Sequence, residues 1–228
     1  MMRFCGTVLL AVATGATSSF DQAPVLQDKA ESEILKREIS LPEFRYSETP
    51  AIIQKALLKA HLPGGIVTVN CSENRRQYAL STPRISIRKL LFAMEQLDPE
   101  YTWQFSNGVV NLLPQQGIPE LLETRFSEFN VQGVTSYEAL NALLEGQETK
   151  RKMAVLGLDK AVISLSIPTY YDPEHSTPEN SFRFDLNLQN VTFRQILNEI
   201  VTKEGHKIWV YMERRCGEET LFSVFLGG

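Results

Sequence analysis

One pattern occurs twice in this chain: a capped amphipathic helix followed by a strand that carries a Trp. The two stretches are "RISIRKLLFAMEQLDPEYTWQF" (residues 84–105) and "NVTFRQILNEIVTKEGHKIWVY" (residues 190–211). They align without a gap at an offset of 106 residues, which pairs Trp103 with Trp209. Ser86 and Thr192 each stand where a helix N-cap is expected. Such self-similarity indicates one supersecondary unit used twice.

The residues before Trp103 complete the first unit. The sequence predicts a strand over 39–46, then a helix with Thr49 as N-cap and Pro50 in its first turn. Strands are expected in "GIVTVNC" and "RQYALSTPRI", and the Asn107–Gly108 turn indicates a closing hairpin. The residues expected to be buried on the second helix are Ile87, Leu90, Leu91, Met94 and Leu97.

The second unit follows the same order, with a capping box predicted at Thr135 and Glu138. Its first helix aligns at an offset of 86, with Thr49 on Thr135, so 20 residues are added before the offset becomes 106. We expect this addition in "DKAVISLSIPTYYDPEHSTPENSFRF" (residues 159–184), where two β-rich runs flank a polar loop.

The predicted fold class is α+β: two small β-α-β-β-α-β-β domains in tandem, with helices packed on mixed or antiparallel sheets. The predicted boundaries are a signal peptide over 1–19, a linker over 20–38, domain 1 over 39–114, a linker over 115–124, and domain 2 over 125–228 with an insertion near 160–182.

The pattern of the two quoted stretches resembles the short N-terminal domain of secretins and TonB-dependent transducers, a relative of the secretin ring-building N-domains. The resemblance covers residues 39–114 and 125–227. It implies a non-catalytic, protein-binding pair of domains in the cell envelope, whose partner is an envelope protein or a second copy of the chain. Neither a β-barrel plug nor a secretin pore region follows in this sequence.

The N-terminal residues indicate where the protein is located in the cell, and its charge argues against nucleic acid as a partner. Arg3, the apolar run "FCGTVLLAVA" and the small residues "TGATSS" are typical of a secretory signal peptide, and the alternative is a buried or frayed N-terminal helix. We therefore expect a periplasmic or extracellular protein without a retained membrane span. A net charge of −4 leaves no basic excess for phosphates, so nucleic acid is not an expected partner.

Export would leave Cys71 and Cys216, an even pair that permits one disulfide in an oxidising compartment. Two buried free thiols are the alternative, because sequence alone cannot bring their Cα atoms within bonding distance. Neither Cys lies in a motif that supplies a base for catalysis.

The loop "YYDPEHSTPEN" is the candidate for partner contact, through Tyr170, Tyr171, Asp172, Glu174 and His175. It occurs in one repeat only, and aromatic side chains are favoured at interfaces. Its carboxylates and imidazole also permit a metal reading, but the spacing matches no EF-hand or zinc signature, and a solvated turn is the simpler interpretation.

No other motif indicates chemistry. The aligned Trp103 and Trp209 are expected to pack on the second helix of their own units, rather than form a ligand platform. Arg88 and Arg194 are expected to face solvent or pair with a carboxylate; the alternative is an interface contact. We predict no catalytic residue, no metal and no cofactor. The alternative function is an envelope ligand-binding, metal-binding or catalytic protein that uses the 170–180 loop or a reactive Cys.

The exported protein should begin after Ala13, Gly15 or Ser18, because each provides a small residue for signal peptidase. Mass spectrometry of the N-terminal peptide from the protein expressed in its native cells measures this. Retention of residues 1–18 in the folded protein would favour the buried-helix alternative.

Overall fold

The computed structural model describes residues 33–69, 76–158, 182–205, 207–216 and 219–227. In chain order its elements are β1 (Glu38–Ser47), α2 (Thr49–Lys59), β2 (Gly64–Val69), β3 (Tyr78–Ser86), α3 (Ile87–Leu97), β4 (Tyr101–Ser106), β5 (Val109–Pro114), β6 (Arg125–Val134), α4 (Ser136–Glu145), α5 (Gln147–Leu156), β7 (Phe184–Thr192), α6 (Phe193–Glu204), β8 (Ile208–Cys216) and β9 (Glu219–Gly227). The predicted α+β class is confirmed.

A five-stranded sheet with the order β4-β5-β2-β8-β9 joins the two repeats. Its middle strand, β2, comes from the first repeat and pairs in parallel with β5 of the same repeat and with β8 of the second. The two hairpins, β4–β5 and β8–β9, are antiparallel. The strands of both predicted units therefore belong to one continuous sheet.

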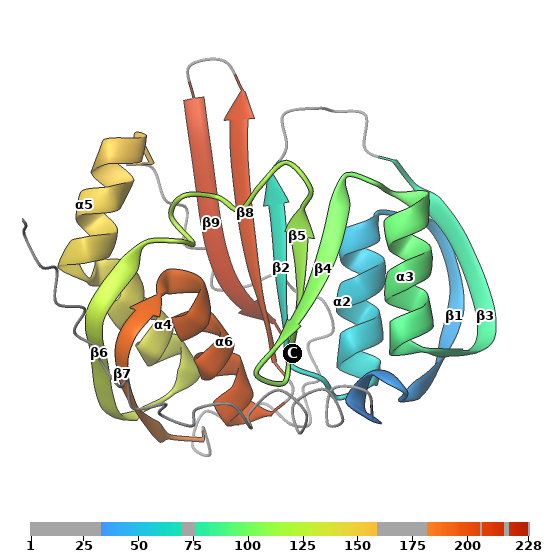
Figure 1. The fold of residues 1–228 in the computed structure, drawn as a ribbon, viewed down its shortest axis with the longest axis horizontal. Helices are drawn as coiled ribbons and strands as arrows, with labels where there is room; N and C mark the ends of the chain where they lie inside the picture. The colour runs from blue at the N-terminus through green and yellow to red at the C-terminus, as the bar shows by residue number, and fades with distance from the viewer. Residues whose placement is uncertain (1–32, 70–75, 159–181, 206, 217–218, 228) are drawn as a thin grey trace, which may run out of the picture.

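Helices of the two repeats cover opposite faces of this sheet (Figure 1). On one side α2 and α3 separate it from the β1–β3 pair, and on the other α4 and α6 separate it from the β6–β7 pair. Successive side chains of a strand point to opposite faces, so Ile66 lies in the core with α2 and α3, while Val67 lies in the core with α4 and α6. Each repeat thus lends strand residues to the core of the other.

Burial confirms the repeat and corrects one alignment. Along the second helices, Ile87, Leu90 and Met94 are buried, and so are the residues 106 positions later, Phe193, Ile196 and Ile200. Along the first helices the buried positions are Ile52, Ile53, Ala56 and Leu57 in α2, and Ala139, Leu140, Leu143 and Leu144 in α4. The offset between these helices is 87, as from Ile52 to Ala139, and the predicted 86 was wrong by one residue.

Three predicted N-caps are confirmed, and a fourth is wrong. Ser86 accepts from Lys89 N, and Thr135 and Thr192 form complete capping boxes with Glu138 and Gln195. Thr49 is not the cap of α2, because Glu48 occupies that position. Instead, the buried Thr49 hydroxyl donates to Asp98 Oδ2 at 2.7 Å, which ties the start of α2 to the end of α3.

Two further expectations concern the surface, and one of them is wrong. Leu97, expected in the core, is 50% exposed, because α3 ends there and the chain turns into Asp98. The Asn107–Gly108 turn is confirmed: both residues have positive φ, 52° and 82°, which a two-residue hairpin of the mirror-image type requires.

Segments expected to be linkers contribute to the cores. Leu35 is fully buried beside α2 and α3, although the linker was expected to run to residue 38. Leu121 and Leu122, from the expected linker over 115–124, are fully buried in the second core. Apolar side chains in a polar stretch thus mark points where the connection is anchored.

Helix α5 was not predicted, and it accounts for part of the added length in the second repeat. Gly157 follows α5 in the left-handed backbone conformation, and His61 adopts the same conformation shortly after α2. The residues that come next, Leu158 and Leu62, are both buried. These pairs lie 96 residues apart, between the offsets of 87 and 106. About half of the insertion therefore precedes residue 159, and the rest falls in residues that the structure does not describe.

Gly65→Ala should destabilise the fold strongly. A Cβ on Gly65 would lie 2.1 Å from Cζ2 of Trp209, whose indole is fully buried, so the sheet or the ring must move. We expect a loss of about 2 kcal/mol or more in the free energy of unfolding, measured with urea. Gly108→Ala is the control: it meets nothing within 4 Å and should cost about 1 kcal/mol through its positive φ. Equal losses would contradict the close approach.

Candidate functional site

The predicted partner-contact residues Tyr170, Tyr171, Asp172, Glu174 and His175 lie outside the described residues, as does Cys71. Cys216 is the last residue of β8. The contact role of the loop and the disulfide therefore stay predictions. The described part of the chain instead shows the junction between the two repeats. It also shows a surface in the first repeat that occupies the position equivalent to that junction.

The junction between the repeats is built around Trp209 on β8. Its indole Nε1 donates to Asn198 Oδ1 of α6 at 2.8 Å, and its ring crosses β2 at Gly65, the residue paired with it in register. Trp209 therefore packs on the second helix of its own unit, as predicted. Only a residue without a side chain lets β2 approach the ring this closely.

Two polar side chains of the first repeat extend this junction. Asn111 of β5 is fully buried, and its Oδ1 lies 2.6 Å from the position of a Cβ on Gly65. Gln104 of β4 accepts from Arg194 Nη1 at 3.3 Å, while Arg194 Nε pairs with Glu123 at 3.2 Å. The predicted ion pair of Arg194 is confirmed: it joins α6 to Glu123 of the segment between the repeats, while the hydrogen bond to Gln104 reaches the first repeat.

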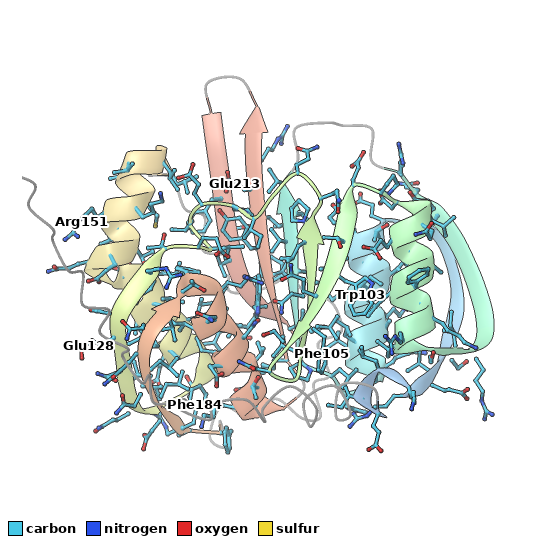
Figure 2. All side chains as sticks on the ribbon, in the orientation of Figure 1. Trp103, Phe105, Glu128, Arg151, Phe184 and Glu213 are labelled. Atoms are coloured by element: carbon cyan, nitrogen blue, oxygen red, sulfur yellow. The ribbon has the colours of Figure 1, made fainter. Side chains whose placement is uncertain are left out.

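No described strand covers the equivalent place in the first repeat. Trp103 and Phe105 of β4 are half-buried against the core of α2 and α3, and Phe92 of α3 is 59% exposed. At the offset of 106, Trp103 corresponds to Trp209 and Phe92 to Asn198, the residue that bonds the Trp209 indole. We call Phe92, Trp103 and Phe105, with the outer edge of β4, the β4 edge surface; Figure 2 labels its two β4 residues, Trp103 and Phe105.

The backbone of β4 alternates between its neighbour and this edge. Gln115 N donates to Glu100 O at 2.8 Å, so the backbone N–H and C=O groups of the even-numbered residues from Glu100 to Ser106 point to β5. The backbone groups of Trp103 and Phe105 therefore point outward, away from β5. On β8, Lys207 O accepts from Gly64 N of β2 at 3.2 Å, so the backbone N–H and C=O groups of Trp209 and Tyr211 point to β2. Among the described strands, none pairs with the outer edge of β4, which ends the sheet.

Titratable groups with displaced pKa values lie away from this surface. Burial, and then the charge of Asp98, raise the pKa of Tyr78, whose hydroxyl donates to Leu97 O. The backbone N–H of Thr135 and the nearby Arg183 lower the pKa of Glu138 in its capping box. A separate buried contact lies on β8, where the Tyr211 hydroxyl donates to the carboxylate of Glu213. These contacts are structural ones within or between neighbouring elements.

Two searches of the described ranges bear on other kinds of site. No three His, Cys, Asp or Glu side chains there gather in a group that could hold a metal ion. No helix in those same ranges has the length and hydrophobicity to span a membrane.

Sequence reasoning did not identify Phe92 or Gly65. The sequence did contain a signal for Phe92, because it aligns with the polar Asn198. This alignment indicates a large aromatic side chain at a helix position outside the set expected to be buried. Gly65 was interpreted only as the first residue of the expected strand "GIVTVNC". Its proximity to Trp209 depends on pairing between strands that are 144 residues apart in register, as from Gly65 to Trp209.

Comparison of the chain with protein-family models, with curated proteins and with solved structures finds no match.

The equivalent positions on α6 and α3 should respond differently to substitution. Asn198→Leu leaves the buried Trp209 N–H without its acceptor and should cost about 1–3 kcal/mol in urea unfolding. Phe92→Ala, at the matched exposed position, should change the free energy of unfolding by no more than about 0.5 kcal/mol. A large loss in Phe92→Ala would mean that Phe92 supports the core rather than the surface.

Proposed function

We propose that this chain is an exported, non-catalytic protein-interaction module of the cell envelope, and that it binds its partner through the β4 edge surface. The observation that supports this most directly is a sheet edge with which no described strand pairs, on a strand whose Trp103 and Phe105 are half-exposed, together with the exposed Phe92 on α3. Exposed strand edges present unpaired N–H and C=O groups, and aromatic residues are enriched in protein interfaces.

The chemistry of the surface favours binding over catalysis. Phe92, Trp103 and Phe105 carry neither a nucleophile nor a group that titrates, and the outward groups of β4 are backbone donors and acceptors. Such a surface recognises another extended chain through hydrogen bonds and apolar contact. Lys89 and Arg88, exposed on the same helix, are solvated charges at its rim.

The resemblance to the short domain of secretins and TonB-dependent transducers, and the signal-like N-terminus, support the envelope location. In those relatives the domain mediates contacts between proteins. The sharing of one sheet by both repeats adds that they act as one body, because β2 cannot leave β8 without exposing Trp209.

Site-specific photo-crosslinking in the native cells tests this function. A benzophenone amino acid at Phe92 should give a discrete covalent adduct in the envelope fraction, because this side chain stands beside the proposed contact. The same group at Val155, which is 76% exposed on α5, is the matched apolar control and should give none. Absence of adducts from Phe92, or recovery of the protein from the cytosolic fraction, would contradict the proposal.

A further inference from the structure

Two strands occupy equivalent positions in the two repeats, β8 and β4. One edge of β8 is paired with β2, whereas no described strand pairs with the equivalent edge of β4. On β8, the outward backbone groups at Trp209 and Tyr211 are met by β2, which runs parallel to β8. On β4, the outward groups at Trp103 and Phe105 occupy the corresponding positions, 106 residues earlier, at the end of the sheet. Because the repeated unit is the same, the filled edge shows what the open edge is shaped to take.

We propose that the outer edge of β4 accepts an extended strand of a partner protein, which runs parallel to β4 and places a glycine opposite Trp103. This inference rests on the proposed function and specifies its site and the chemistry of its partner. The bound segment is apolar and β-branched after the glycine, as β2 is in "GGIVTV". The bound strand would be the sixth of the sheet, which now has the order β4-β5-β2-β8-β9.

The glycine requirement comes from the indole. At the filled edge the Trp209 ring extends past its own strand and lies over Gly65, where a Cβ would be 2.1 Å from Cζ2 and 2.2 Å from Cε2. Trp103 stands at the same position of an edge strand, and it is half-buried, whereas Trp209 is fully buried. A strand at β4 would cover the part of the Trp103 ring that now faces solvent, provided that its residue there is small.

Phe92 makes the open edge suited to a separate chain. Its counterpart, Asn198, is 7% exposed and is occupied with Trp209, whereas Phe92 is 59% exposed. Phe92 lies on α3, which contacts β4, so an apolar side chain of that size is expected to add buried area when a peptide docks, at about 25 cal/mol per Å². Hydrogen bonds between the two backbones then supply affinity, and the side chains of Phe92 and Trp103 supply selectivity.

A second copy of this chain is a poor occupant. Its β2, the strand with the required glycines, already has neighbours on both sides, β5 and β8. Pairing of β4 with β4 of another copy would bring no glycine to Trp103, because the strand reads "YTWQFS". The described strand at the other end of the sheet, β9, has its glycine at its last residue, Gly227. The required strand is therefore expected from a different protein.

A synthetic peptide with the sequence of residues 62–69, "LPGGIVTV", extended by two lysines for solubility, is the probe. It is added to the mature protein, and amide hydrogen exchange is followed by NMR. The amides of Trp103 and Phe105 should gain protection, while those of Thr102 and Gln104, already bonded to β5, should not change. Trp103 emission should shift to the blue, since the other tryptophan, Trp209, is fully buried.

Two matched controls separate strand addition from adhesion to an apolar surface. The peptide that carries the change Gly65→Val should bind at least about tenfold more weakly, because its side chain would collide with the Trp103 ring. The protein variant Phe105→Pro removes an outward N–H from the edge strand and should lose peptide binding while keeping its circular dichroism spectrum.

Each outcome decides the proposal. Outward protection with loss of binding in both controls supports it, and absence of protection overturns it. If the outward amides are protected without peptide in a monomer, a segment of this chain fills the edge. If that protection grows with protein concentration, a second copy does. Either result overturns the partner assignment. An adduct at Phe92 without peptide binding would leave the proposed function standing and overturn this inference alone.

Discussion

The structure depends on the parallel pairing of β2 with β8, with Gly65 beneath the Trp209 indole. This pairing joins two repeats into one sheet and places each repeat's strand residues in the core of the other. It is possible only because one strand has no side chain where the other has its largest. The indole is also held from its polar side by Asn198, so the ring has one orientation.

The two repeats share a fold and differ in what covers the Trp-bearing strand. In the second repeat that strand is internal, its tryptophan is fully buried, and the helix residue beside it is polar and bonded. In the first repeat the strand is at the end of the sheet, its tryptophan is half-exposed, and the helix residue is Phe92. A difference of this kind between otherwise equivalent positions is the basis of the binding role that we propose, because the fold itself does not require it.

Local signals in the sequence predicted the elements well. Ser86, Thr135 and Thr192 acted as caps because hydroxyl side chains satisfy the free N–H groups of a helix start, and Asn107–Gly108 turned because both residues tolerate positive φ. Predictions that needed neighbours distant in sequence were weaker. Thr49 was taken for a cap, but its hydroxyl bonds Asp98, and Leu121 and Leu122 were taken for a linker although a second core surrounds them.

The sequence by itself determined the repeated α+β unit, its helix starts, its hairpin and the correspondence between Trp103 and Trp209. Periodicity and capping are properties of short stretches, so they are legible without contacts. Only the tertiary structure decided that β2 pairs with β8, that Trp209 is covered, and that β4 is left at the edge. Strand pairing is set by which faces and edges are buried together. Near the two tryptophans the sequence differs at Phe92 and Asn198, but that difference alone does not say which strand lies beside β8.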